Sequence, residues 1–328
     1  MIADGRIRVV TLAGSRLRSI GNLISRLRLR KWLSSRAAHG EIDIIEAPDY
    51  LGLVPFPIRG CPVVIRLHLT STIICAHAEQ AIPRGISAYE KRTLLENSNW
   101  IAVSNYILEE TQKTFCVSPR RSAVIVNPVP PAPVAASQGP EVPSNYVLYA
   151  GQLSRRKGAL VLAEAMRSLM GSRPDLHLVY AGASVAREGP IEQEIKQILG
   201  PALCERVHFL GHLDREKVLS CMRRARVFAF PSRLEAAGLV LLEAMSCGVP
   251  VVCTSYPPAS LMVEDGATGL LVDPTSPSDI EEKIARLIDD SEFGKHLAAA
   301  AREQVAQRFS LESCLDATEG FYHECLRA

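Results

Sequence analysis

The sequence predicts an α/β protein made of two doubly wound domains. Short apolar, β-branched runs alternate with longer segments of helical periodicity, and a proline-rich stretch divides the series. Near-continuous apolar strands separated by helices are typical of parallel sheets that are covered on both faces. A chain of 328 residues is also long enough for two domains of ordinary size.

The first domain is expected over residues 1–130, followed by a linker over 131–145. The strand-like runs of the first domain are IDIIEAP, PVVIRLH, WIAVS and SAVIVNP. Residues 127–145 contain six prolines and almost no large apolar side chain. Such a segment cannot build a core, so we interpret it as a hinge between the domains.

The second domain is expected over 146–310. Its strand-like runs are YVLYAG, LHLVYAG, RVHFLG, RVFAFPS, VPVVCTS and TGLLVDP. Helical segments lie between the later runs, at 159–170, 190–199, 216–224 and 278–289. Residues 311–328 are interpreted as a C-terminal helix that can pack back on the first domain.

Composition places the chain among soluble globular proteins. The hydrophobic fraction is 47% and the charged fraction 22%, while a net charge of +2 is too small to indicate nucleic-acid binding. The nine cysteines include no C-x-x-C pair, and several lie in apolar runs, which favours reduced thiols in a cytoplasmic protein. No secretory segment opens the chain, and no apolar run is long enough to span a bilayer.

The N-terminal segment is strongly basic. Residues 1–36 contain nine arginines and lysines and a single acidic residue, Asp4. An apolar stripe at helical spacing consists of Leu17, Ile20, Ile24 and Leu27. This helix can lie on the anionic inner face of a membrane, as a peripheral contact. Alternatively, it packs its stripe on the sheet and exposes the arginines, which is the more common fate of such stripes.

Ligands of doubly wound sheets bind at the carboxyl ends of the strands. After YVLYA comes GQLSRRKG, which contains Lys157, and after VFAFPS comes LEAAGLVLLEAMSCG. The helix that starts near Gly238 presents unsatisfied amides to an anion. Lys157 from the neighbouring loop would then hold a diphosphate against those amides.

Two glutamates bracket that helix start. Glu235 and Glu243 are eight positions apart, which is roughly 12 Å along a helix. This separation is comparable with the distance from a sugar across a diphosphate to a ribose. The alternative is that Glu235 precedes the helix as a dipole-favoured residue and Glu243 is simply solvated.

The motifs resemble those of the retaining glycosyltransferases of family 4, which have the two-domain GT-B fold. In the second domain they are GQLSRRKG, GHLDREKVLSCMRRARVFAFPS, PSRLEAAGLVLLEAMSCGVPVV, EDGATGLLVDP and RFSLES, in that order. In the first domain DIIEAPDYLG, VVIRLH, ENSNWIAVSNYI and AVIVNPV also fit. The resemblance implies two Rossmann-like domains that face a cleft containing the active site.

The resemblance also implies the reaction and its partners. A sugar would move from a UDP- or GDP-sugar donor to an acceptor hydroxyl with retention of anomeric configuration, in polysaccharide or glycolipid synthesis. The acceptor would be a saccharide or a lipid-linked saccharide. No metal is expected, because the chain lacks the Asp-x-Asp motif that places a divalent metal on a nucleotide diphosphate.

The roles of individual residues follow from the same resemblance. The catalytic residues would be Glu235, which binds sugar hydroxyls, Lys157, which with Arg156 stabilises the departing diphosphate, and His68, which reaches the sugar from the first domain. Glu243 would bind the ribose, and Leu213 and Asp214 would contact the base. The donor-binding set is Gly151, Gln152, Arg155, Arg156, Leu213, Asp214, Ala237, Gly238, Leu239, Val240 and Glu243.

Structural alternatives exist for several of these residues. His68 could be an ordinary strand-end histidine. Arg155 and Arg156 could be solvated turn charges, whereas Lys157 is better supported by the glycine that follows it. Asp214 could be the N-cap of the next helix.

The chain departs from the family pattern in three places. Gln152 stands where the family usually has arginine, and Pro257–Pro258 and Leu261 stand where it has a Gly-Gly pair and a glutamate. The family's first strand and glycine-rich loop have no counterpart before IRVVTLAG, so we expect an incomplete N-terminal domain. A truncated chain, a misassigned start and a lost activity all fit this gap. The alternative function is therefore a non-catalytic GT-B protein that binds a nucleotide sugar or a protein partner.

Overall fold

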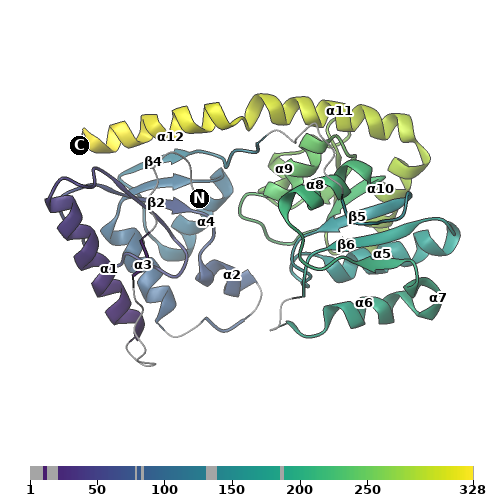
Figure 1. The fold of residues 1–328 in the computed structure, drawn as a ribbon, viewed down its shortest axis with the longest axis horizontal. Helices are drawn as coiled ribbons and strands as arrows, with labels where there is room; N and C mark the ends of the chain where they lie inside the picture. The colour runs from purple at the N-terminus through teal and green to yellow at the C-terminus, as the bar shows by residue number, and fades with distance from the viewer. Residues whose placement is uncertain are drawn as a thin grey trace. The chain divides into compact units, whose positions relative to one another are not determined.

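The computed structural model describes residues 10–12, 21–77, 80–82, 85–130, 139–184 and 188–327. The chain divides into two compact units. Unit 1 comprises Met1–Val103, Ile107–Val124 and Thr318–Ala328, and unit 2 comprises Ser104–Tyr106 and Ile125–Ala317. Each unit contains one parallel sheet with helices around it (Figure 1). The α/β prediction is confirmed, and the expected gap before IRVVTLAG falls largely outside the described residues.

Unit 1 is built on a sheet of four parallel strands in the order β1-β2-β3-β4. The strands are β1 (Ile45–Pro48), β2 (Val63–Leu67), β3 (Asn99–Ala102) and β4 (Arg121–Val124). The helices are α1 (Gly21–Ala38), α2 (Ser71–His77), α3 (Ile86–Glu96) and α4 (Asn105–Phe115). All four strands overlap the runs that the sequence predicts, and β3 and β4 each start one residue before the predicted run.

Helix α1 packs through a different face from the predicted stripe. Leu27 is 41% exposed, whereas Arg26 and Leu33 are buried. The Arg26 guanidinium donates to the carbonyl of Gly52 at 2.7 Å and also to that of Leu51. These backbone acceptors satisfy the buried cation, so the arginine turns inward in place of the stripe. The prediction that the stripe packs on the sheet is therefore wrong at Leu27, while Leu17 and Ile20 lie outside the described residues.

Unit 2 is built on a sheet of six parallel strands in the order β10-β9-β8-β5-β6-β7. The strands are β5 (Tyr146–Ala150), β6 (His177–Ala181), β7 (Val207–Phe209), β8 (Val227–Phe230), β9 (Val251–Thr254) and β10 (Leu270–Val272). All six coincide with predicted runs. Because the chain runs outward from β5 to β7 and then returns to the other side of β5, the strand order reverses between β5 and β8. That reversal is the switch point at which such sheets bind ligands.

The helices of unit 2 cover both faces of its sheet. They are α5 (Ala159–Ser172), α6 (Ile191–Leu199), α7 (Pro201–Cys204), α8 (Arg215–Arg224), α9 (Leu239–Cys247), α10 (Pro277–Asp289) and α11 (Ser291–Arg308), with the 3₁₀ turn η3 (Ala259–Leu261). The last helix, α12 (Leu311–Leu326), begins in unit 2. One core joins α5, α6 and α10 to the sheet, and the other joins α8 and α9 to its opposite face (Figure 1).

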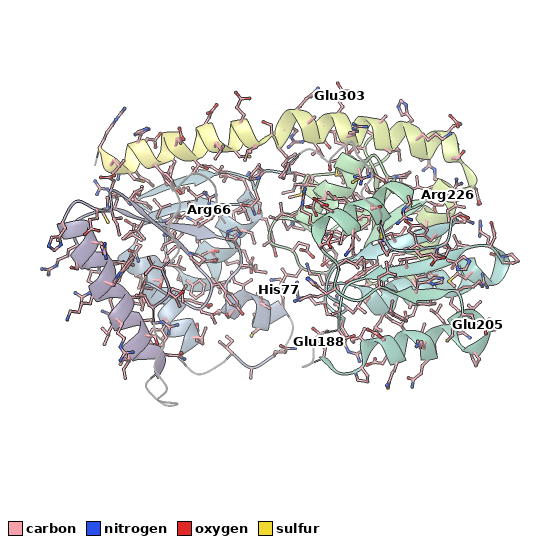
Figure 2. All side chains as sticks on the ribbon, viewed as in Figure 1. Arg66, His77, Glu188, Glu205, Arg226 and Glu303 are labelled. Atoms are coloured by element: carbon pink, nitrogen blue, oxygen red, sulfur yellow. The ribbon has the colours of Figure 1, made fainter. Side chains whose placement is uncertain are left out.

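The C-terminal part of α12 belongs to unit 1. The Tyr322 hydroxyl donates to Glu46 Oε2 at 2.6 Å, and Arg66 donates to both oxygens of the same carboxylate at 2.9 and 2.8 Å. Figure 2 shows Arg66 on β2. The hydrogen bonds from Arg66 and Tyr322 outweigh the effect of burial and lower the pKa of Glu46. This network ties the C-terminal part of α12 to β1 and β2.

The segment that leads to the proline-rich stretch groups with unit 2. Val129 is buried, and its amide donates to the carbonyl of Phe309 at 3.0 Å. Residues 131–138 of the predicted linker lie outside the described part of the chain.

Candidate functional site

A cavity of about 650 Å³ opens at the carboxyl ends of β5 and β6 in unit 2. Its volume is within the range of small-molecule and cofactor sites. It contains five of the predicted donor-binding residues: Gly151, Gln152, Leu213, Val240 and Glu243. Its other lining residues are Ala150, Ala181, Gly182, Ala183, Ser184, His212, Arg215 and Val218.

The two loops that follow β5 and β6 meet through their backbones. A Cβ added to Gly182 would lie 1.8 Å from the carbonyl oxygen of Gly151, so a larger residue cannot stand there. The Leu153 amide also donates to the carbonyl of Ala183 at 3.0 Å. Because small residues and backbone form this wall, a ligand can approach the strand ends closely.

Lys157 and Glu235 form an ion pair near the end of β8. The Glu235 side chain is 9% exposed, and the Ser232 hydroxyl donates to its Oε1 at 2.6 Å. The tight contact between the two loops explains the pairing, since a Cβ on Gly158 would lie 2.1 Å from the carbonyl oxygen of Pro231. The predicted catalytic residues of unit 2 are thus in contact with each other.

Helix α9 starts beside this pair without a side-chain cap. Its N-cap, Gly238, has a left-handed backbone (φ 55°), and no side chain accepts from the first amides. Ala237 is buried, whereas Leu239 is 42% exposed. The first turn therefore offers amides and a positive dipole end to an anion, as the sequence predicts.

The two arginines before Lys157 make different contacts. Arg155 has a 59% exposed side chain and pairs with Glu194 at 2.5 Å. Arg156 donates to the carbonyl of Leu234 at 2.8 Å, and its own carbonyl accepts from the amide of Arg233 at 2.8 Å. Arg156 thus braces the loop that presents Glu235, and neither arginine lines the cavity.

Arg215 is a cavity residue that the sequence reasoning missed. Its Nε donates to Glu243 Oε1 at 2.5 Å. The sequence carried one signal for it, namely its place at the first position of the helix that follows the GHLD loop. That signal does not indicate which side chain an arginine there would contact.

Asp214 makes the contacts of a helix cap. Its Oδ1 accepts from the amide of Lys217 at 3.0 Å, and its Oδ2 pairs with the Lys217 ammonium at 2.9 Å. These hydrogen bonds lower the pKa of the Asp214 carboxyl. Its side chain is 57% exposed and does not line the cavity, so the capping alternative describes its observed contacts.

His68 follows β2 in unit 1. Its amide donates to Asp49 Oδ1 at 3.2 Å. Burial, and secondarily the charge of Arg66, lower the pKa of the imidazole. A neutral ring is therefore the dominant form of His68 at neutral pH.

Two buried carboxylates lie near His68, and the sequence reasoning missed both. Glu90 is fully buried and accepts from the amides of Leu51 at 3.0 Å, Ser71 at 2.8 Å and Thr72 at 3.0 Å. Asp49 is 1% exposed, its Oδ2 has no hydrogen-bond partner among the described residues, and burial raises its pKa to about 7. Glu90 stands in an otherwise ordinary helical pattern and Asp49 in a loop, so neither carried a signal of burial.

The described residues contain neither a metal-binding cluster nor a membrane-spanning helix. Among the described residues, no three histidine, cysteine or carboxylate side chains come together in a way that could hold a metal ion. Within the same residues, every helix is too short or too polar to cross a bilayer.

The chain matches two family models. Residues 135–304 match the model described as glycosyl transferases group 1, and residues 3–132 match the one described as glycosyltransferase family 4. Glycogen synthase of Mycobacterium tuberculosis is 27% identical over 305 residues, covering 90% of this chain and 72% of that protein. Alpha-D-kanosaminyltransferase of Streptomyces kanamyceticus is 30% identical over 179 residues, covering 54% of this chain and 45% of that protein.

Solved structures share the fold along most of the chain. Sucrose-phosphate synthase from Thermosynechococcus elongatus aligns with a TM-score of 0.73 at 23% identity, covering 96% of this chain and 82% of that one. Anabaena HepE in complex with UDP and glucose aligns with a TM-score of 0.73 at 21% identity, covering 93% and 83%. The two parallel sheets, the switch-point cavity and the matched models lead to one conclusion: the chain has the GT-B fold and belongs to the glycosyl transferases group 1 family.

Proposed function

We propose that the protein is a retaining glycosyltransferase that moves a sugar from a UDP- or GDP-sugar to an acceptor hydroxyl, in polysaccharide or glycolipid synthesis. The observation that carries the proposal is the arrangement of Lys157, Glu235 and Glu243 around the start of α9, beside a cavity at the switch point of unit 2. The family membership and the relatives named above support the same reaction class.

The donor diphosphate would lie at the start of α9. Its charge would be met by the first amides of the helix and by the Lys157 ammonium, which would leave Glu235 when the ligand enters. This interaction strengthens as negative charge develops on the departing diphosphate, so it favours the transition state over the ground state. Glu235, released from Lys157, would accept hydrogen bonds from the sugar hydroxyls. In this proposal cations and amides neutralise the leaving group without a metal ion.

The nucleoside would occupy the cavity. Glu243 would accept from the ribose hydroxyls, and the backbone of the loop that contains Leu213 would contact the base. A saccharide or lipid-linked acceptor would be bound by unit 1, where His68 would supply a neutral imidazole to the sugar. The proposal is consistent with one structural neighbour, Anabaena HepE, whose structure contains UDP and glucose.

The test uses a panel of UDP- and GDP-sugars, with release of the nucleoside diphosphate as the readout. The purified protein should release the nucleoside diphosphate from one donor of the panel at a rate above background. Glu235→Gln and Lys157→Ala should each reduce kcat by about 100-fold or more. Arg155→Ala is the matched control from the same loop, and it should retain activity. If no donor releases its diphosphate, or Glu235→Gln is as active as the parent, the catalytic proposal is wrong.

The stereochemistry has a separate readout. NMR of the freshly formed product should show the anomeric configuration of the donor sugar. An inverted product would overturn the retaining assignment while leaving the transfer reaction intact. Binding of a nucleotide sugar without turnover would instead favour a non-catalytic GT-B protein.

A further inference from the structure

Arg215 introduces a cation on the nucleoside side of the cavity. It and Glu243 are the two oppositely charged side chains among the residues that line the cavity in the described part of unit 2. The Arg215 side chain is 42% exposed, whereas the Glu243 side chain is 20% exposed. The carboxylate is therefore the more enclosed member of the pair.

The N-cap of α8 fixes the position of Arg215 at the beginning of the helix. Asp214 caps α8 by accepting from the amide of Lys217, so Arg215 is the first residue of a helix with a defined beginning. Its Nη2 also lies 3.5 Å from the carbonyl oxygen of Pro130. The guanidinium is thus held between a backbone carbonyl and the Glu243 carboxylate.

The contact with Arg215 gives the two oxygens of Glu243 different tasks. Oε1 accepts from Arg215 Nε, and Oε2 can then accept from a ligand hydroxyl. A carboxylate that is already held in one rotamer loses less conformational entropy when it binds a ligand. A hydrogen bond from a hydroxyl to a charged acceptor is also stronger than one to a neutral acceptor.

We propose that Arg215 is a positioning residue for Glu243, and that it thereby sets the preference of the cavity for ribonucleotides over deoxyribonucleotides. The inference rests on the proposed function, since it takes the cavity as the nucleoside part of a donor site. The competing explanation is that the pair is an exposed ion pair of little consequence, as most surface salt bridges are.

The experiment measures binding of UDP, GDP and their 2′-deoxy and 3′-deoxy analogues by calorimetry. The parent protein should bind the preferred ribonucleotide about tenfold more tightly than its deoxy analogues, because a charged acceptor that is held in place discriminates against a missing hydroxyl. Arg215→Gln should weaken the ribonucleotide by about five- to tenfold and leave the deoxy analogues nearly unchanged. Arg215→Lys, which keeps the charge, should restore part of the discrimination.

Two further variants control the measurement. Arg173→Gln removes an arginine from another exposed ion pair of unit 2, with Asp289, and should leave every affinity unchanged. Glu243→Gln should abolish the discrimination, and adding Arg215→Gln to it should have no further effect on the ratio, because the arginine acts through the glutamate. Thermal unfolding of each variant checks that the fold is retained.

Each outcome has a defined meaning. An unchanged ribose-to-deoxyribose ratio in Arg215→Gln overturns the inference, whether both affinities fall together or neither changes. If Glu243→Gln removes the discrimination and Arg215→Gln does not, the proposed function stands and the positioning role is wrong. If the parent protein binds neither UDP nor GDP, the proposed function fails, and the inference fails with it.

Discussion

The three adjacent cations of the GQLSRRKG loop, Arg155, Arg156 and Lys157, make different contacts. Arg155 is turned to solvent and paired with Glu194, Arg156 holds the carbonyl of Leu234, and Lys157 is paired with Glu235. In the proposed site, only Lys157 would contact the diphosphate. Arg156 would instead act by keeping the loop of Glu235 in place.

The contrast between the two arginines is measurable. Arg156→Ala should reduce kcat/KM for the donor by about tenfold or more, since a displaced Glu235 loop loses its orientation toward the sugar. Arg155→Ala should change it by less than about twofold, because an exposed ion pair contributes little. Steady-state kinetics of both variants check this. Equal losses would indicate that the loop acts through its total charge and not through the brace.

Asp49 should make the stability of the protein depend on pH. Folding raises its pKa from 3.8 to about 7, first by burial and then by the charge of Glu90. Between about pH 4 and pH 7 the folded state therefore holds a proton that the unfolded state releases, so the free energy of unfolding falls as pH rises. At 1.36 kcal/mol per pKa unit, the full loss is on the order of 4 kcal/mol as an upper limit.

The variant Asp49→Asn isolates this effect. An amide cannot ionise but can still accept from the amide of His68, so the decline with pH should be shallower than in the parent. Denaturant unfolding at several values between about pH 5 and pH 8 gives the comparison. Parallel curves for the two proteins would show that Asp49 does not titrate in this range.

Site residues differ in how far the sequence could predict them. Glu235, Glu243 and Lys157 could be predicted as site residues because they stand in segments that follow strands and resemble the motifs of family 4 glycosyltransferases. The partner of each one was not predictable, since a tertiary contact such as Arg215 with Glu243 joins residues 28 positions apart. The contacts of Asp214, in contrast, could be predicted from the sequence, because its partner Lys217 is only three residues away in a helix-capping pattern.

Among the elements, α2 depends on a residue of another helix for its start. Glu90 in α3 accepts from the amides of Ser71 and Thr72, which open α2, and from that of Leu51. These donors would otherwise be buried without an acceptor, which is costly. The Glu90 carboxylate thus supplements the local cap, in which the Thr70 hydroxyl accepts from the amide of Ile73 at 3.2 Å, and it fixes α3 against α2.

Removing this carboxylate should destabilise the protein strongly. Glu90→Ala leaves several amides unsatisfied and should lower the free energy of unfolding by about 3–5 kcal/mol. Glu96→Ala is the control on the same helix. Glu96 forms an i,i+4 pair with Arg92 and is 30% exposed, so its loss should cost less than about 1 kcal/mol. Denaturant unfolding that ranked the two variants equally would contradict the capping role.

The two glycines of the α5 region should respond oppositely to substitution. Gly158 precedes α5 with φ of 80°, and a Cβ there would lie 2.1 Å from the Pro231 carbonyl oxygen. Gly158→Ala should therefore destabilise the protein by more than about 2 kcal/mol. Gly171 lies within α5 with nothing inside 4 Å of an added Cβ, and Gly171→Ala should stabilise by about 0.5–1 kcal/mol. Thermal unfolding of both variants checks the two signs.

The strands were predictable as elements, because each is a short apolar run bounded by turn residues. The packed face of α1 was not. Periodicity identified a stripe, but the acceptors that bury Arg26 are the carbonyls of Leu51 and Gly52, which are distant in sequence. A stripe therefore indicates a helix more reliably than it indicates which side of that helix is inside.

At the scale of the whole molecule, unit 1 is assembled from separate parts of the chain. Thr318–Ala328 contributes to it together with Met1–Val103 and Ile107–Val124. The sequence allowed the C-terminal helix to pack back on the first domain. It could not identify Tyr322, Glu46 and Arg66 as the contact, because no local pattern relates them.

Loss of the hydrogen bond from Tyr322 to Glu46 should be detectable mainly in unit 1. Tyr322→Phe removes the donor to Glu46 and should lower the free energy of unfolding by about 1 kcal/mol. Hydrogen exchange should accelerate in β1 and β2, while β5 and β6 of unit 2 should exchange as in the parent. Uniform acceleration in both sheets would show that the contact stabilises the chain globally and not unit 1 in particular.

Because the C-terminal part of α12 belongs to unit 1, it affects the order in which the two units can complete their folding. Domains ordinarily fold in the order in which the ribosome releases them, N-terminal first. Here the first unit lacks Thr318–Ala328 until the whole of the second unit has been synthesised. The contact of Tyr322 with Glu46 can therefore form only after the whole of unit 2 has been synthesised, although β1 is made before any strand of unit 2.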